Sequence, residues 1–211
     1  AADYARDHAA SEWASRLAGV DAVINAIGIF RERGAQTFEA IHVRGPRALF
    51  SACAALDIKV VQISALGADA GAASAYHLSK READDFLLRV CPGAVVAQPS
   101  VVFGESGASA RLFTTLAALP VIPLPGTGDQ LIQPIHIDDL AAAVVELVEN
   151  DGCAGQRVPL VGREPVTLRD FLGGLRRSMG LGAVAFARVP LRVSRRSPSP
   201  WTANASDVSM P

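Results

Sequence analysis

The sequence predicts an α/β fold in which a doubly wound parallel sheet is covered by helices on both faces. Three observations lead to this prediction. The segments 21–30 ("DAVINAIGIF") and 58–64 ("IKVVQIS") have the length of strands and are almost continuously apolar, as is typical of parallel strands buried on both faces. They alternate with segments whose apolar residues recur at helical spacing. The 211 residues, of which 50% are hydrophobic, are enough for a sizeable core.

The expected elements follow one another along the chain. Gly19 ends the first helix, Asp138 is a helix N-cap, and Thr167 with Asp170 forms a capping-box pattern. The segment 191–211 is rich in Ser, Pro and Arg, which predicts a disordered tail. Strands are expected over 21–30, 58–64, 93–99 and 131–137, and helices over 8–18, 38–56, 74–90, 108–119, 138–149 and 167–179.

The composition argues against several classes of protein. The net charge of −1 gives no bias towards nucleic acid, so no such partner is expected. Cys53, Cys91 and Cys153 lack metal-ligand spacing, and we expect reduced thiols, no metal site and a cytoplasmic location. No apolar run has the length of a transmembrane segment.

The segment "SAYHLSKREADD" (74–85) places Tyr76 and Lys80 four residues apart, and therefore on one face of the expected helix. A phenol has a pKa near about 10, and a nearby ammonium is expected to lower it. Such a tyrosine exchanges a proton with a substrate hydroxyl or carbonyl. The spacing therefore indicates an acid/base pair, whereas the alternative is a chance pairing on a solvated face.

The scarcity of lysine favours the functional interpretation. Lys59 and Lys80 are the only lysines among the 20 Lys and Arg residues, so a surface cation would nearly always be arginine. Arginine does not replace lysine here, because its guanidinium stays charged and has a different reach. Ser64 ends the expected strand twelve residues before Tyr76, at the edge of the sheet where α/β proteins bind ligands. A serine at that place is otherwise a common turn former.

An ordered set of motifs resembles the extended and atypical short-chain dehydrogenases/reductases. The set consists of Ser64, Tyr76-x3-Lys80, "NAIG" (25–28), "QPSVVFG" (98–104) and "QPIHIDDLA" (133–141). "TFEAIHVRGPRALFSAC" and "VVQISALGA" resemble in particular the branch that contains an accessory subunit of respiratory complex I and bacterial NAD-dependent epimerase/dehydratase-like proteins.

This resemblance implies a Rossmann fold that binds NAD or NADP. It implies that Tyr76 is the acid/base, that Lys80 holds the nicotinamide ribose and lowers the pKa of Tyr76, and that Ser64 orients the reacting oxygen. The residues that it places beside the cofactor are Ala26, Ile27, Gly28, Tyr76, Lys80, Pro99 and Val102.

The sequence departs from the family pattern in three ways. No glycine-rich turn occurs near residue 1, so the first strand, its helix and the second strand are expected to be missing, together with the residue that selects NAD or NADP. His42 stands where many relatives have Asn, and Gln98 where Arg is common. The last two departures leave the substrate class open.

The resulting organisation is a partial NAD(P)-binding core over 1–105, an interleaved sheet and substrate-side region over 106–190, and the tail. Two functions remain open. One is an oxidoreductase or epimerase/dehydratase acting on a small molecule. The other is a non-catalytic NAD(P)H-binding module, with either a homodimer or a membrane complex as the partner.

Overall fold

The computed structural model describes residues 2–104 and 107–190, so the tail expected over 191–211 lies outside the described residues. The chain divides into two compact units, each formed by two separate stretches. The first unit consists of Ala1–Pro99 and Ala141–Leu160, and the second of Ser100–Leu140 and Val161–Pro211.

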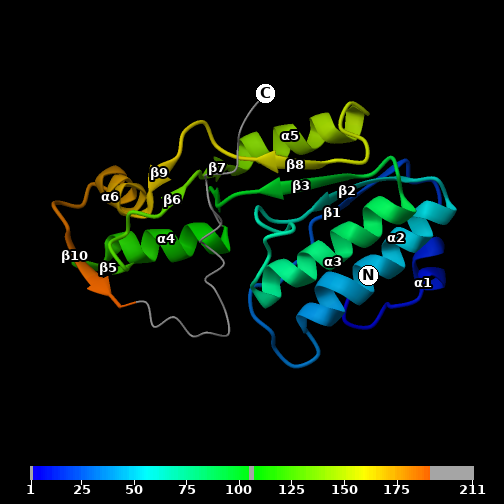
Figure 1. The fold of residues 1–211 in the computed structure, drawn as a ribbon, viewed down its shortest axis with the longest axis horizontal. Helices are drawn as coiled ribbons and strands as arrows, with labels where there is room; N and C mark the ends of the chain where they lie inside the picture. The colour runs from blue at the N-terminus through cyan, green and yellow to red at the C-terminus, as the bar shows by residue number, and fades with distance from the viewer. Residues whose placement is uncertain (1, 105–106, 191–211) are drawn as a thin grey trace. The chain divides into compact units, whose positions relative to one another are not determined.

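The first unit is built on a parallel sheet with the strand order β1-β2-β3-β8 (Figure 1). Its strands are β1 (Ala22–Asn25), β2 (Lys59–Ile63), β3 (Val95–Pro99) and β8 (Arg157–Leu160). The register pairs Asn25 with Gln62 and Ile63 with Ala97, so the carboxyl ends of the first three strands meet at one edge. The predicted parallel α/β fold is thereby confirmed. The strand expected over 21–30 ends already at Asn25, and β8 was not predicted.

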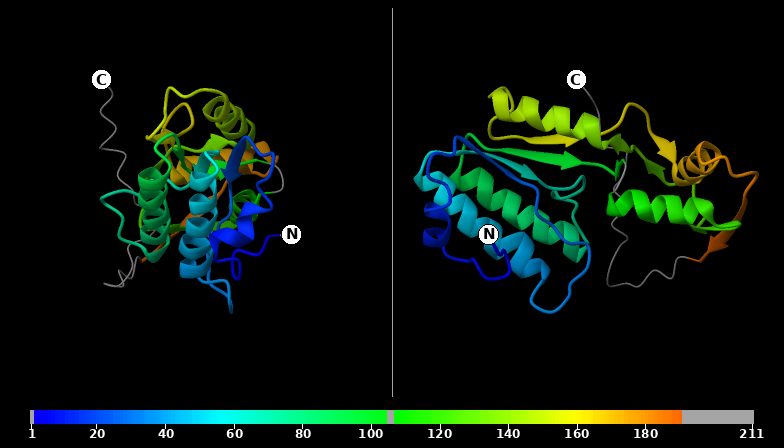
Figure 2. Two further views of the ribbon diagram at one scale, coloured as in Figure 1. Left: turned by 90° about the vertical axis from the view of Figure 1, so that its right-hand side faces the viewer. Right: turned by 180° about the vertical axis from the view of Figure 1, so that it is seen from behind.

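Helices α2 (Gly45–Ala55) and α3 (Ala75–Val90) lie side by side on one face of this sheet, and α5 (Ile137–Glu149) lies on the other (Figure 2). The expected helix 38–56 begins with a π-helical segment, η1 (Glu39–Arg44), which continues into α2. Ile24 of β1 is 50% exposed, so within the described chain the expected cover of both faces is incomplete at this edge strand. The fully buried core side chains between the helices and the sheet are Phe50, Cys53, Val60, Ala83, Leu87 and Val96.

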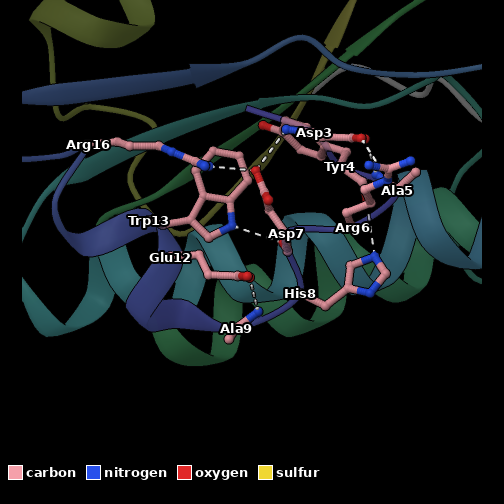
Figure 3. A network of polar contacts seen from close by, with 10 residues as sticks. All are labelled: Asp3, Tyr4, Ala5, Arg6, Asp7, His8, Ala9, Glu12, Trp13 and Arg16. Carbon is pink, nitrogen blue, oxygen red and sulfur yellow. Dashed lines mark hydrogen bonds and ion pairs between the residues drawn. The ribbon is translucent and has the colours of Figure 1, made fainter. Parts of the chain in front are cut away.

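The segment before β1 is held by hydrogen bonds around Asp7 (Figure 3). Its carboxylate accepts from the backbone N–H of Asp3 at 2.7 Å and from Arg16 at 2.6 Å, and its carbonyl accepts from the Trp13 indole at 3.1 Å. The helix expected over 8–18 is only α1 (Ala10–Ala14). These contacts fix the position of Tyr4, whose ring meets Trp13 edge-on.

Tyr4 begins a buried polar chain that joins the first two strands. Its hydroxyl donates to Asn25 Oδ1 at 2.8 Å, and Asn25 Nδ2 donates to Gln62 Oε1 at 2.6 Å. Asn25 and Gln62 are opposite each other in the register of β1 and β2. The chain therefore satisfies two buried amides at the carboxyl end of the sheet.

The second unit contains short two-stranded pairings and two helices. The helices α4 (Ala108–Ala118) and α6 (Leu168–Ser178) pack against each other. Its buried core side chains are Phe113, Ile122, Leu124 and Leu172. The strands β5 (Val121–Pro125) and β10 (Ala185–Val189), absent from the predicted elements, pair in parallel. The strands of this unit are β4 (Val102–Phe103), β5 (Val121–Pro125), β6 (Leu131–Ile132), β7 (Ile135–His136), β9 (Val166–Thr167) and β10 (Ala185–Val189).

Three further findings concern the classes considered from the sequence. Among the described residues no helix is long and apolar enough to cross a membrane. Cys53, Cys91 and Cys153 are free thiols, the first two of them buried. In the same part of the chain no three His, Cys, Asp or Glu residues lie together in a way that could hold a metal ion.

Candidate functional site

The candidate site lies in the first unit, where helix α3 passes the carboxyl ends of β1 and β2. Ser74 starts the helix as its N-cap, because its hydroxyl accepts from the backbone N–H of His77 at 3.2 Å. Tyr76 and Lys80 follow on the first two turns and share one helical face. Helix α3 therefore carries the predicted acid/base pair to the edge of the sheet.

Lys80 is buried, with 4% of its surface exposed. Its Nζ donates to the carbonyl oxygens of Ile27 and Ile63, both at 3.1 Å, so it joins the loop after β1 to the end of β2. An ammonium carries three N–H donors, and the described residues occupy two of them. Burial lowers the pKa of Lys80 to about 8, and the charge of Asp84 acts in the opposite direction.

Gly28 lies directly against this ammonium. A Cβ at this position would be 3.2 Å from Lys80 Nζ and 3.5 Å from His42 Nε2. A side chain here would press on the lysine, and glycine therefore lets the loop after β1 approach Lys80 closely. Ala26, Ile27 and Gly28 are all exposed in this loop.

Tyr76 is enclosed by rings. Phe30 stacks on it with centroids 5.4 Å apart, and Phe38, His42 and His77 meet it edge-on. Its hydroxyl forms no hydrogen bond with any described residue. Burial raises the pKa of Tyr76 to about 12, and the negative charge of Asp84 adds to the shift. Burial is the largest cause of this shift and Lys80 is not among its causes, so the lowering of this pKa by Lys80 stays a prediction.

The structure brings Ser64 together with Asp84. The buried Ser64 hydroxyl donates to Asp84 Oδ2, and Asp84 follows Lys80 by one helical turn. Asp84 is 0% exposed, and burial raises its pKa to about 7 while the Ser64 hydrogen bond opposes that shift. Sequence reasoning missed this residue. The signal was present, because Tyr76, Lys80 and Asp84 repeat the same four-residue step on α3.

His42 is a further residue of the site, to which sequence reasoning gave no role. Its Nε2 is 2.9 Å from the backbone N–H of Ile29, which can only donate, so Nδ1 carries the proton and donates to Ser79 Oγ at 2.9 Å. Burial lowers the pKa of His42 to about 3, and the Lys80 charge adds to the shift. A neutral histidine in the π-helical segment therefore joins the loop after β1 to helix α3.

Pro99 and Val102, the two remaining residues predicted to lie beside the cofactor, belong to different units of the chain. Pro99 is buried at the end of β3, and its carbonyl accepts from the backbone N–H of Leu66 at 3.0 Å. Its neighbour Gln98 donates through Nε2 to the carbonyl of Ala68 at 3.1 Å. Val102 belongs to the second unit, on β4. Pro99 therefore lies at the same sheet edge as Ser64, while Val102 is described only within its own unit.

Comparisons with known proteins agree with this architecture. A ceramide reductase of Caulobacter vibrioides is 26% identical over 167 residues, which cover 78% of this chain and 52% of that protein. The mitochondrial NADH dehydrogenase [ubiquinone] 1 alpha subcomplex subunit 9 of Arabidopsis thaliana is 26% identical over 159 residues, 74% of this chain and 40% of that protein. The chain thus spans about half, or less, of the length of these curated relatives.

A solved structure with the same Rossmann-like fold is the dTDP-glucose 4,6-dehydratase of Streptomyces venezuelae, determined with NAD bound. It matches with a TM-score of 0.72 at 22% identity, over 90% of this chain and 66% of the other. Residues 2–158 match the family described as the NAD dependent epimerase/dehydratase family. Because this match extends over most of the sequence, the chain belongs to the NAD-dependent epimerase/dehydratase family.

Proposed function

We propose that this chain carries the acid/base site of an NAD(P)-dependent oxidoreductase, with Tyr76 as the group that exchanges a proton with the substrate oxygen. The observation that supports this proposal most is the Tyr76 hydroxyl. It has no hydrogen-bond partner among the described residues, and it shares a helical face with a buried ammonium that keeps one donor free. Both groups therefore keep hydrogen-bonding capacity that no described residue uses.

The residues around Lys80 fit the nicotinamide end of the family's cofactor. Gly28 brings the loop after β1 against Lys80 Nζ with no side chain between them, and the remaining N–H of Lys80 suits a ribose hydroxyl. When bound, the cofactor supplies or accepts the hydride. The residues proposed to line it are Ala26, Ile27, Gly28, Tyr76, Lys80, Pro99 and Val102.

The protonation state of Tyr76 favours the direction of carbonyl reduction. With its pKa raised to about 12, the phenol is neutral at pH 7 and can donate a proton to an oxygen that gains negative charge. A bound nicotinamide cofactor would supply the hydride to the carbonyl carbon, and the proton from Tyr76 would complete the alcohol. The Ser64 hydroxyl already donates its hydrogen bond to Asp84. It can therefore orient a substrate hydroxyl by accepting a hydrogen bond, and it does not donate to a carbonyl.

The surroundings of Tyr76 favour a carbonyl carried on an apolar molecule. Phe30 stacks on the phenol and is itself 68% exposed, and Phe38 closes a further side. Ring faces of this kind recognise apolar surface rather than phosphate or sugar hydroxyls. The similarity to a protein named ceramide reductase supports a lipid-like ketone as the substrate class.

Turnover in the intact gene product that carries this sequence tests the acid/base role. Nicotinamide absorbance is followed with long-chain ketones and with sugar nucleotides. Tyr76→Phe removes only the hydroxyl and is expected to lower kcat by about 10²- to 10⁴-fold. Tyr4→Phe is the matched control, because Tyr4 is the other tyrosine of the chain and bonds only Asn25 through its hydroxyl. Full turnover in Tyr76→Phe would show that the role is wrong.

A second candidate is a non-catalytic NAD(P)H-binding module of a larger assembly, such as a respiratory membrane complex. Three observations favour this candidate. The Ser64 hydroxyl is hydrogen-bonded to Asp84, the pKa of Tyr76 is high, and the chain is similar to the alpha subcomplex subunit 9. Tight binding of NADPH with no turnover on either substrate class would support this candidate. In that case Lys80→Ala would weaken binding, whereas Tyr76→Phe would leave it nearly unchanged.

A further inference from the structure

Asp84 is a buried carboxyl group that has no role in the proposed proton and hydride transfer. It lies on α3 one turn after Lys80 and is 0% exposed. Its Oδ2 accepts from Ser64, whereas its Oδ1 is buried and has no hydrogen-bond partner among the described residues. Burying a carboxylate with one oxygen unpaired is unfavourable. Simple packing is therefore a poor explanation for this residue.

The contacts of Asp84 and Lys80 form one clamp between α3 and β2. Lys80 Nζ donates to the carbonyl of Ile63 at 3.1 Å, and Asp84 accepts from the hydroxyl of Ser64, the next residue along the chain. Two side chains one helical turn apart thus hold two consecutive residues at the carboxyl end of the strand. A change at Asp84 that releases Ser64 also shifts the carbonyl that binds Lys80.

The charges around Asp84 come from two elements. Lys80 and Asp85 lie on α3 with it, and Arg157 lies on β8, whereas the uncharged Ser64 directly follows β2. Burial lowers the pKa of Lys80, and the negative charge of Asp84 raises it. Arg157 already pairs with the exposed Asp85. Above its own pKa of about 7, Asp84 is therefore the buried anion that favours the charged form of Lys80.

We propose that Asp84 is a positioning residue that acts through Lys80, fixing the ammonium against the end of β2 and keeping it charged. The inference rests on the proposed function only for the importance of Lys80. The geometry of the clamp and the charge on Lys80 can be measured without substrate or cofactor.

The chain offers a direct measurement, because Lys59 and Lys80 are its only lysines. Protein labelled with 13C at lysine Cε gives two signals, and the pH titration of the Lys80 signal reports its pKa. In Asp84→Asn the midpoint of Lys80 is expected to fall by about 1 to 3 pH units, as expected when a nearby opposite charge is lost. The Lys59 signal, from a lysine paired with Asp151, serves as the internal control.

Asp85→Asn is the matched control variant, because it removes the same charge at the neighbouring, exposed position. It is expected to move the Lys80 midpoint by less than Asp84→Asn does. Ser64→Ala provides a second route if Asp84→Asn does not fold. It removes the donor to Asp84, favours the protonated carboxyl, and is expected to lower the Lys80 midpoint by a smaller amount.

A Lys80 midpoint that stays unchanged in folded Asp84→Asn, or in Ser64→Ala when only that variant folds, would overturn the inference. This result is distinct from failure of the proposed function, which the turnover of Tyr76→Phe decides. Where turnover is measurable, the alkaline limb of the kcat profile of Asp84→Asn should move with the Lys80 midpoint. A purely structural role would lower the amount of folded protein without moving that limb.

Discussion

His42 accepts a hydrogen bond from the backbone N–H of Ile29 across 2.9 Å, between the π-helical segment and the loop after β1. The same imidazole donates from Nδ1 to Ser79 on helix α3. The loop that carries Gly28 is therefore tied to the helix that carries Lys80 through one neutral histidine. Because this histidine must stay neutral, the stability of the site depends on pH even without a substrate.

Replacement of His42 is expected to reduce the acid sensitivity of the fold. The pKa is lowered from 6.5 to about 3 in the folded chain, so the unfolded chain binds the proton more readily between these values. The contribution of His42 to stability is fully present above pH 6.5 and is lost as pH falls towards 3, by up to about 5 kcal/mol. His42→Asn does not titrate and should flatten this dependence.

Urea unfolding of the unchanged chain and of His42→Asn at several pH values between 4 and 7.5 is the measurement. His136→Asn, in the second unit, controls for the loss of a histidine elsewhere. Equal slopes for His42→Asn and the unchanged chain would contradict the role assigned to the buried imidazole.

How far the sequence predicts this site depends on whether a feature is local. The pairing of Tyr76 and Lys80 on one face follows from helical geometry alone, and the structure contains it. Asp84 has the same spacing, but a charged residue on a helix is normally solvated, and its burial depends on how α3 packs on β2 and β3. The partner of Ser64 likewise depends on tertiary packing, because a hydroxyl rotates to suit its neighbours.

The errors in the predicted elements have equally specific causes. The apolar run 21–30 ends as a strand at Asn25, because the following residues turn towards Lys80. The π-helical segment within 38–56 keeps an apolar pattern that hydrophobic periodicity does not distinguish from an α-helix. Strand β8 is short, with 4 residues, and Pro159 within it weakens its strand signal.

Asp84→Asn is expected to stabilise the fold at alkaline pH. The carboxyl pKa is raised from 3.8 to about 7 in the folded chain, so the protonated form is favoured by folding. The contribution of Asp84 to stability is therefore fully present below pH 3.8. It is lost as pH rises through 7, by up to about 4 kcal/mol. Asn stays neutral and retains an oxygen that can accept from Ser64.

Unfolding free energies at pH 5 and pH 8.5 test this expectation. The advantage of Asp84→Asn over the unchanged chain should be larger at pH 8.5 than at pH 5. If the variant is instead less stable by the same amount at both pH values, the carboxyl is not a source of electrostatic strain.

Gly28→Ala is expected to disturb the position of Lys80 more than the stability of the fold. The new Cβ would be 3.2 Å from Nζ, at the mobile end of a long side chain that can move away. The movement breaks the hydrogen bond to the Ile27 carbonyl and takes the ammonium out of its position. Binding of NAD(P)H by the intact gene product should weaken by about tenfold or more.

Isothermal titration with NADH and NADPH measures this effect. Gly93→Ala is the matched control, because a Cβ there meets no atom within 4 Å. Unchanged binding in Gly28→Ala would show that the close approach of this loop to Lys80 has no part in holding the cofactor.

Gln62→Leu is expected to destabilise the carboxyl end of the sheet. Gln62 Oε1 accepts from Asn25 Nδ2 at 2.6 Å, and both residues are buried. Leucine is similar in size but leaves the Asn25 amide without an acceptor, which costs about 1–3 kcal/mol. Tyr4→Phe removes the neighbouring bond of the same chain, and because Tyr4, Asn25 and Gln62 form one network, the double variant should lose less than the sum of the two single losses. Urea unfolding of the two single variants and the double variant measures this coupling. Strictly additive losses would show that Asn25 does not join Tyr4 and Gln62 energetically.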